Sequence, residues 1–522
     1  MTRLKDVNST DILDAIRLGC QTMCSVFNAD DSDIPFFGSS VLPEAELNFS
    51  SFNSEAHVPG RHLNALLSAE NAAGIVIDDE CVEKHADAAF FSYSGPLPLP
   101  LNRDQIGGRL VNFRPHHLRE GFHALYALAK YRDSARAREL AEESIAAIFS
   151  YWDAARGWDC KRLTEELGLN VLSESSFIVG IARAIGPLVK LYRDTGYGPA
   201  LELAIVLKEK AISGFFDVDG AYDRDRFGPH THSTTCVMSS LAQLADLTMD
   251  SPLMNRVRAF YDNGLWEIRN GLGWVIESSL PDAPSDLGEV NNTGDILETA
   301  LILGRWGHTE YYHDAERILR GHLLPSQLRD ISFIEDPPNP ENVDGKRDVA
   351  ARHRGAFGFP APYGHAPLGK TLISFNMDIV GGAVGSLCEA YREATRFDQA
   401  GHWVNLLFDH ETDAIKVESP YTHSALRIRV KRPGPLFVRV PPWVEEEKIE
   451  IRGVSGRPQF TNGYLLIPSP PVGQMLSLAF PLPRQEIVLQ QQERQIRTLL
   501  RGDQVEAMEN FGADLTFFEP LD

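Results

Sequence analysis

The stretch from His116 to Trp152, HHLREGFHALYALAKYRDSARARELAEESIAAIFSYW, holds two helical patterns joined by a short polar turn. In the first half, Leu118, Phe122 and Leu125 recur at intervals of three and four residues, which places them on one helix face. The second half is rich in Ala, the residue that favours helices most. The stretch therefore predicts a pair of antiparallel helices.

Similar helical patterns recur on both sides of this pair. Short polar turns alternate with long loops rich in Gly, Pro, His and Asp, at 216–232, 271–291 and 330–370. This alternation is typical of a ring of helix pairs with tight turns at one end and functional loops at the other. We expect an (α/α)6 toroid over residues 55–402, since no fixed repeat period supports a solenoid. The further predicted helices cover 12–27, 55–73, 175–192, 200–213, 233–247, 252–270, 292–303, 311–324 and 375–394.

The hydrophobic period changes to two residues near position 403. Ala425-Leu-Arg-Ile-Arg-Val-Lys431 alternates between apolar and basic residues, and similar short runs follow. Turn residues separate these runs, which is typical of an antiparallel β-sandwich. The sequence therefore predicts a mainly α protein with a toroid followed by a β-sandwich. The predicted domains are an N-terminal segment (1–54), the toroid (55–402), the sandwich (403–489) and a C-terminal tail (490–522).

The chain of 522 residues has 50 Lys and Arg against 72 Asp and Glu, a formal net charge of −22. This acid excess argues against nucleic acid and anionic membranes as partners. No apolar run is long enough to span a bilayer, and the first residues do not resemble a secretion signal. The six cysteines are scattered, so we interpret Cys20 and Cys24 as reduced core residues. We expect a cytoplasmic protein and, from the frequency of symmetric dimers, a homodimer.

The long loops carry acids, aromatic residues and histidines. This combination suits carbohydrates, because sugar CH faces stack on aromatic rings and carboxylates bind hydroxyl groups. Two carboxylates across a cavity are the usual apparatus for glycosidic cleavage. Each acid also has a purely structural interpretation, as a solvated loop acid or a charge at a helix N-terminus. The predicted catalytic residues are Glu277, Glu289 and Asp378, and the predicted sugar-binding residues are His116, His230, His232, Trp274, Asn291, Tyr363 and His365.

The sequence His230-Thr-His232 raises the question of a metal site. Two histidines and a glutamate could bind zinc, but no second close ligand pair accompanies them. Alternate residues on a loop that enters a helix are expected to point apart. We therefore expect neither a metal ion nor another cofactor.

Several motifs together resemble the bacterial β-L-arabinofuranosidase family, glycoside hydrolase family 127 and its relatives. They are Gly60-Arg-His-Leu-Asn-Ala-Leu-Leu, the helix from His116 to Tyr126, His230-Thr-His-Ser-Thr, Tyr312-His-Asp-Ala-Glu-Arg-Ile-Leu and Phe437-Val-Arg-Val-Pro-Pro-Trp. The resemblance covers about residues 55–485. It implies a toroid with a β-sandwich and hydrolysis of a terminal sugar such as L-arabinofuranose.

The departures from this family concern its metal site. The resemblance implies that a Glu and three Cys hold zinc and that one Cys is the nucleophile. The matching positions here are Glu289, Asn291 and Met377-Asp378, so the three thiolates are replaced. Glu277 is the best match to the family's general acid. We expect carboxylates to act without zinc, with retention if Asp378 attacks and inversion if Glu289 or Asp378 activates water.

Two other functions stay open at this point. One is a polysaccharide or oligosaccharide lyase, which needs a base and a cation for a uronate; Tyr363, His365, Arg352 and Arg354 could serve. The other is a non-catalytic sugar-binding protein, which the loss of the thiolates suggests. Fold alone does not decide between these functions.

Overall fold

The computed structural model describes residues 2–8, 11–454, 458–491 and 494–521. Within these ranges, six inner helices form a closed ring in which each helix packs against the next and the last returns to the first. The inner helices are α2 (Val58–Ala73), α4 (Leu118–Arg132), α7 (Ile185–Thr195), α10 (Thr231–Thr248), α12 (Val290–Arg305) and α15 (Met377–Ala394).

An outer helix packs against each inner one, which confirms the (α/α)6 toroid. The outer helix that packs on α15 is α1, the first helix of the chain. Residues predicted as a separate N-terminal segment therefore complete the sixth helix pair of the ring. The outer helices are α1 (Ile12–Met23), α3 (Asp79–Ser92), α5 (Ala135–Tyr151), α8 (Gly198–Gly214), α11 (Ser251–Asp262) and α13 (Glu310–Ile318).

Local signals and burial explain why the predicted pair around residue 133 forms. Helix α4 ends at Arg132, followed by Asp133 in the left-handed conformation, and α5 begins after Ser134, whose side chain accepts a hydrogen bond from the Ala137 amide. Phe122 and Leu125 are fully buried in the large core between the helices.

None of the described helices is long and apolar enough to cross a bilayer.

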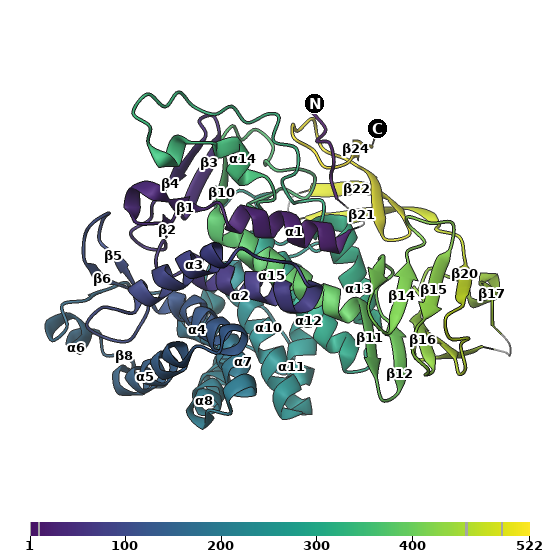
Figure 1. The fold of residues 1–522 in the computed structure, drawn as a ribbon, viewed down its shortest axis with the longest axis horizontal. Coiled ribbons are helices and arrows are strands. Elements are labelled where there is room, and N and C mark those ends of the chain that lie inside the picture. The colour runs from purple at the N-terminus through teal and green to yellow at the C-terminus, as the bar shows by residue number, and fades with distance from the viewer. Residues whose placement is uncertain (1, 9–10, 455–457, 492–493, 522) are drawn as a thin grey trace.

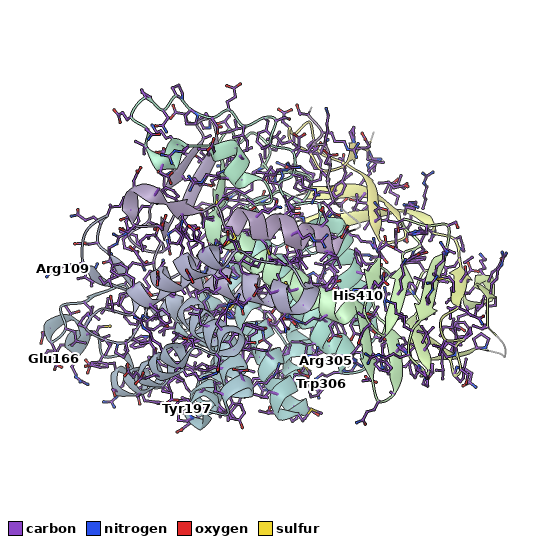
Figure 2. All side chains as sticks on the ribbon, in the orientation of Figure 1. Arg109, Glu166, Tyr197, Arg305, Trp306 and His410 are labelled. Atoms are coloured by element: carbon purple, nitrogen blue, oxygen red, sulfur yellow. A yellow bond between two sulfur atoms is a disulfide. The ribbon has the colours of Figure 1, made fainter. Side chains whose placement is uncertain are left out.

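The C-terminal ends of three inner helices are tied together by one charged group. Arg305, at the end of α12, donates to Asp246 of α10 at 2.8 Å and to Glu393 of α15 at 2.6 Å. The Trp306 indole donates to the same Asp246 at 2.9 Å. Arg305 and Trp306 are labelled in Figure 2 near the boundary with the sandwich. These contacts fix the end of the ring opposite the long loops.

Two five-stranded sheets form the predicted β-sandwich beside the ring (Figure 1). Their facing side chains, among them Val404, Ile428 and Leu476, build a separate core. Strands β12 and β16 pair in parallel and the other neighbours are antiparallel. In spatial order, the first sheet consists of β11 (Thr395–Asp398), β12 (Gly401–Val404), β16 (Leu436–Arg439), β19 (Tyr464–Ile467) and β18 (Gln459–Thr461). The second sheet consists of β13 (His410–Glu411), β14 (Ile415–Glu418), β15 (Leu426–Val430), β20 (Met475–Ala479) and β17 (Glu450–Arg452).

The C-terminal residues form a sheet of their own instead of a tail. Its strands pack over the late loops of the toroid, where Leu489 and Phe517 share a core with Leu4, Tyr363 and Phe375. The sheet starts inside the range predicted for the sandwich. Its strands are β21 (Arg484–Gln491), β22 (Arg494–Arg501), β23 (Gln504–Met508) and β24 (Glu519–Pro520).

Short elements fill the loops at the open end of the ring. One small sheet pairs the N-terminal β3 (Gly38–Leu42) with β10 (Ile373–Asn376), directly before α15, and so joins the two ends of the toroid sequence. The short elements are β1 (Phe27–Asn28), β2 (Ile34–Pro35), β3 (Gly38–Leu42), β4 (Glu46–Asn48), β5 (Leu101–Arg103), β6 (Leu110–Phe113), β7 (Trp152–Asp153), β8 (Gly157–Trp158), α6 (Cys160–Glu165), β9 (Asn170–Val171), α9 (Arg224–Phe227), α14 (Val349–His353) and β10 (Ile373–Asn376).

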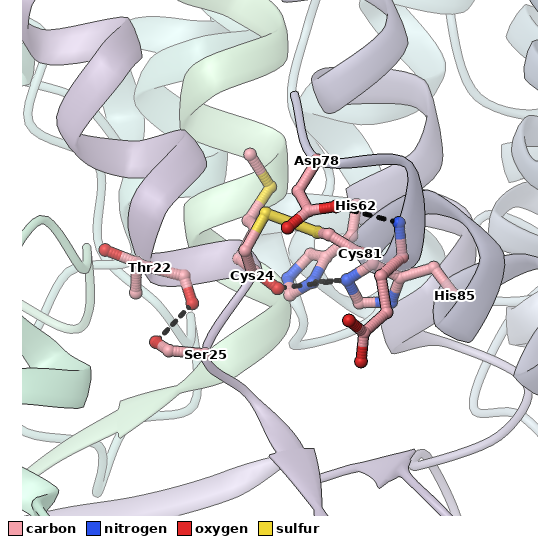
Figure 3. The surroundings of a disulfide bond; sticks show 9 residues. Thr22, Cys24, Ser25, His62, Asp78, Cys81 and His85 are labelled. Atoms are coloured by element: carbon pink, nitrogen blue, oxygen red, sulfur yellow. Dashed lines mark hydrogen bonds between the residues drawn. A yellow bond between two sulfur atoms is a disulfide. The ribbon is translucent and has the colours of Figure 1, made fainter. Parts of the chain in front are cut away.

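One disulfide corrects the expectation for the cysteines. Cys24, at the end of α1, is bonded to Cys81 in the first turn of α3, while Cys20 stays a free buried thiol. Figure 3 shows the bond beside His62 and His85, whose ring nitrogens lie 3.2 Å apart. The two bonded cysteines are 57 residues apart in sequence, so their spacing could not reveal the pairing.

Candidate functional site

A cavity of about 320 Å³ lies where the inner helices begin. His57 and His116 precede α2 and α4, His230 and Glu289 directly precede α10 and α12, and Asp378 lies in the first turn of α15. Helix N-termini favour negative charge, which suits the two carboxylates. The lining residues are Phe37, Asn53, His57, Arg61, Arg114, His116, Val179, His230, His232, Glu277, Glu289, Phe359, Asn376, Asp378 and Ile379.

The three acids that the sequence singled out line this same cavity. Glu277 comes from the long loop before α12, and its carboxyl forms no hydrogen bond or ion pair with the described part of the chain. Burial and then the nearby charge of Glu289 raise the pKa of Glu277. The arrangement therefore favours a proton on Glu277.

Glu289 is held as an anion against the cavity wall. Asn291 Nδ2 donates to Glu289 Oε1 at 2.7 Å. Burial raises the pKa of Glu289, but hydrogen bonding and the charge of His230, together with Arg61, outweigh burial and lower it. Asn291 thus lies next to the cavity and orients a carboxylate, although it is not among the lining residues.

Asp378 is a buried anion with two partners. Its Oδ2 lies 3.2 Å from His57 Nε2 and 3.4 Å from Arg61 Nη1. Burial alone would raise the pKa of Asp378, but Arg61 and the hydrogen bond from His57 lower it below the usual range. A carboxylate held in this way can attack a carbon or take a proton from water.

Glu120 anchors Arg61, Arg183 and His57 beneath the cavity. Its Oε1 lies 3.1 Å from Arg61 and 3.0 Å from Arg183, and its Oε2 lies 3.5 Å from His57 Nδ1. Although burial opposes ionisation, Arg183, His57, Arg61 and Arg119 hold the pKa of Glu120 well below its usual range. This buried anion fixes both groups that contact Asp378.

The histidine pair corrects the expectation that its side chains point apart. His230 Nε2 lies 3.6 Å from Glu289 Oε2, and His232 Nδ1 lies 3.4 Å from Glu289 Oε1. His230 has an extended backbone and His232 is already helical, so the chain turns between them and brings both rings to one carboxylate. Burial lowers the pKa of His232 well below 6.5, which favours a neutral ring.

Three predicted sugar-binding residues lie away from the cavity. The Trp274 indole donates to the Pro360 carbonyl at 2.8 Å, the Tyr363 hydroxyl donates to Asp286 at 2.5 Å, and His365 packs on Phe517. These aromatic residues come from long loops, but packing against the neighbouring loops and the C-terminal sheet buries them. His116, His230 and His232 do line the cavity.

The residues considered for a lyase are also placed elsewhere. Arg352 donates to the carbonyls of Ser25 and Phe27, at 2.7 and 2.6 Å. It therefore stabilises the N-terminal region. Tyr363, His365, Arg352 and Arg354 are all absent from the residues that line the cavity.

Sequence reasoning missed His57, Arg61, Phe37 and Phe359, which all line the cavity. The sequence does contain a signal that could have located His57 and Arg61. Pro59 lies in the first turn of α2, and proline often marks the start of a helix. Helix starts lie at the open end of the ring, so His57 and Arg61 could have been placed there. Phe37 and Phe359 lie on loops, where no periodicity indicates which way a ring points.

Comparison with known proteins gives the fold. No family model matches the sequence, and no curated protein matches it. A GH127 β-L-arabinofuranosidase from Geobacillus stearothermophilus T6 is 16% identical, with a TM-score of 0.59 over 96% of this chain and 81% of that one. A second GH127 β-arabinofuranosidase is 12% identical, with a TM-score of 0.58 over 94% and 79%.

A sugar epimerase from a ruminal bacterium is 10% identical, with a TM-score of 0.50 over 73% of this chain and 99% of that one. Its coverage of this chain is smaller than the coverage by the two arabinofuranosidases, which span nearly all of it. The chain thus has the fold of the GH127 β-L-arabinofuranosidases, ring and sandwich together.

Proposed function

We propose that the protein is a glycoside hydrolase that releases a terminal sugar from an oligosaccharide or glycoside. The observation that carries this proposal is that Glu277, Glu289 and Asp378 face one cavity. Its volume of about 320 Å³ lies at the lower end of the range for small-molecule sites. A cavity of this size suits one sugar ring, which is why we propose a terminal sugar.

The partners of each acid suggest its role. Asp378 is paired with His57 and Arg61 and so acts as an anion, either as nucleophile or as base. Glu277 has no such partner and is proposed as the acid that protonates the leaving oxygen. Attack by Asp378 on the sugar gives retention, and attack by water gives inversion. Glu289 completes the carboxylate set beside Glu277.

The remaining wall of the cavity suits a sugar. His116, His230 and His232 offer ring nitrogens to hydroxyl groups, and Phe37 and Phe359 offer apolar faces to the CH groups of a sugar ring. The structural likeness to β-L-arabinofuranosidases makes an L-arabinofuranose-like sugar the first choice of substrate.

A panel of 4-nitrophenyl glycosides that includes both anomers of the L-arabinofuranoside tests the proposal. We expect release of 4-nitrophenol from at least one member. An unsaturated product from a uronate oligosaccharide, seen by its new ultraviolet absorption, would instead identify a lyase. Sugar binding without turnover of any substrate would identify a binding protein, and either result would overturn the proposal.

A further inference from the structure

Three side chains at one wall of the cavity bring possible metal-ligating atoms close together. One ligand atom from each of His230, His232 and Glu289 can be chosen so that all three lie within 4.8 Å of one another. The contacts of His230 Nε2 and His232 Nδ1 with the Glu289 carboxylate measure 3.6 and 3.4 Å. In a tetrahedral site with bonds of about 2.0–2.1 Å, neighbouring ligand atoms lie roughly 3.3 Å apart. The two histidine–carboxylate distances are therefore close to the spacing of ligands in a metal site, and the third, between the two histidines, is at most 4.8 Å.

The second ring nitrogen of each histidine lies near a partner of its own. His230 Nδ1 lies 2.8 Å from Ser233 Oγ, and His232 Nε2 lies 3.3 Å from Asp295 Oδ2. The Glu289 carboxylate accepts the Asn291 amide. Histidines that bind metals nearly always give their second nitrogen to a carboxylate, a carbonyl or water, which fixes the ring. Asp295 Oδ2 lies within reach of His232 Nε2 and can fix this ring on metal binding, although no hydrogen bond joins the two atoms in this structure.

The metal chemistry follows from the donor types. Two imidazoles and one carboxylate favour zinc and similar transition metals over Mg²⁺ or Ca²⁺, which prefer oxygen ligands. Three protein ligands leave a coordination position free, as in catalytic zinc sites. The thiolates implied by the family resemblance are replaced by Asn291, Met377 and Asp378, so a thiolate site does not fit this chain.

We propose that His230, His232 and Glu289 bind one divalent transition metal ion, zinc being the first choice, with the free coordination position facing the sugar cavity. This proposal replaces the expectation of a metal-free site, which assumed that the two histidines diverge, and it leaves His116 as the histidine that contacts sugar hydroxyl groups directly. An ion there supplies a Lewis acid for a sugar oxygen. The three side chains hold it and orient it toward the cavity that Glu277 and Asp378 also line.

The charges around the site are compatible with a dication. Glu289 supplies a carboxylate at the cavity wall, and Asp295 lies behind it, 3.3 Å from His232 Nε2. Three arginines act on His232, and each is paired with an acid: Arg61 with Glu120 and Asp378, Arg183 with Glu120, and Arg119 with Glu120 and Asp295.

Zinc binding to the full-length protein, freed of metal with a chelator, tests the proposal by calorimetry. We expect one equivalent of Zn²⁺ per chain. His230→Asn and Glu289→Gln each remove a ligand and should weaken binding by more than about 100-fold, and Asp295→Asn should weaken it by about 10–100-fold. The control is His423→Asn, because His423 lies on the surface near Asp409 and should leave the affinity unchanged.

X-ray absorption of the zinc-loaded protein identifies the ligands without any substrate. We expect only nitrogen and oxygen neighbours at about 2.0–2.2 Å and no sulfur at about 2.3 Å. Less than stoichiometric binding, sulfur in the first shell, or unchanged affinity in both His230→Asn and Glu289→Gln would overturn the proposal. If Glu289→Gln fails to fold, His230→Asn decides, because His230 is only half-buried. Neither measurement depends on the glycosidase activity.

Discussion

His57 lies between two buried carboxylates. Its Nε2 is 3.2 Å from Asp378 Oδ2 at the cavity, and its Nδ1 is 3.5 Å from Glu120 Oε2 beneath it. The ring is buried, and burial lowers its pKa although Glu120 pulls in the opposite direction. A neutral ring carries one N–H, and donating it to Asp378 keeps this carboxylate ionised. Because His57 contacts Asp378 and is absent from the predicted site, it is the most informative residue to change first.

We expect His57→Ala to move the acidic limb of the activity profile to higher pH. Activity requires the Asp378 anion and is lost as the pH falls through the pKa of Asp378. His57 lowers that pKa, so its removal raises the pKa and the loss begins at higher pH. The pH profile of kcat/KM measures this, and His57→Gln, which keeps an N–H donor, should restore part of the shift. If the acidic limb of His57→Ala stays at the same pH, His57 does not lower the pKa of Asp378.

Glu277→Gln tests the general acid. A poor leaving group needs protonation, whereas 4-nitrophenolate leaves without it. We expect turnover of alkyl glycosides to fall by about 10²–10⁴-fold and turnover of the 4-nitrophenyl glycoside to fall much less. The control is Glu267→Gln, an exposed acid on a nearby 3-10 helix. Equal losses on both substrates would argue that Glu277 only binds the sugar.

Asp503 should stabilise the contact between α13 and the C-terminal sheet in a pH-dependent way. It accepts hydrogen bonds from Arg317 and Trp443 and lies 3.5 Å from His313. Although burial opposes ionisation, His313 and Arg317 lower the pKa of Asp503 to about 2.

The unfolded chain has an Asp pKa of about 3.9, so the stabilisation is complete above this value and is lost as the pH falls toward 2. Asp503→Asn should therefore reduce the free energy of unfolding by about 2 kcal/mol at pH 7 and by little near pH 2. Thermal melts over this range measure the difference. An effect of the same size at both ends would show that ionisation of Asp503 contributes nothing.

The disulfide between Cys24 and Cys81 should stabilise the N-terminal helix against α3. Closing a loop of this length reduces the freedom of the unfolded chain, so Cys24→Ser should lower the free energy of unfolding by about 2–4 kcal/mol without reductant. With reductant the difference should disappear. Cys160→Ser is the control, because Cys160 is an exposed free thiol. Six titratable thiols in the unreduced, unfolded protein would contradict the bond.

The sequence predicted the elements of the fold better than their long-range packing. The spacing of Leu118, Phe122 and Leu125 and the alternation around Ile428 predicted α4 and β15 because side-chain periodicity follows directly from local geometry. Helix α3 was missed, since its buried side chains are mostly small ones such as Cys81 and Ala88. The docking of α1 on α15 joins segments more than 350 residues apart, which no local pattern encodes.

Prediction of the site was likewise limited by long-range packing, which local sequence patterns do not encode. Glu289 and Asp378 were found because they precede or begin helices, and helix starts lie at the open end of the ring. Tyr363 and His365 were placed there wrongly, because their burial depends on packing against neighbouring loops and the distant C-terminal sheet. The convergence of His230 and His232 on Glu289 depends on backbone angles that residue spacing does not give.

Turnover of 4-nitrophenyl glycosides by the native protein and by Asp378→Asn tests the central claim most directly. We expect the native protein to hydrolyse at least one glycoside and Asp378→Asn, with unchanged thermal stability, to be slower by at least about 10²-fold. Hydrolysis at an equal rate by Asp378→Asn, or no hydrolysis by the native protein of any glycoside that it binds, would contradict the claim that this cavity cleaves glycosidic bonds.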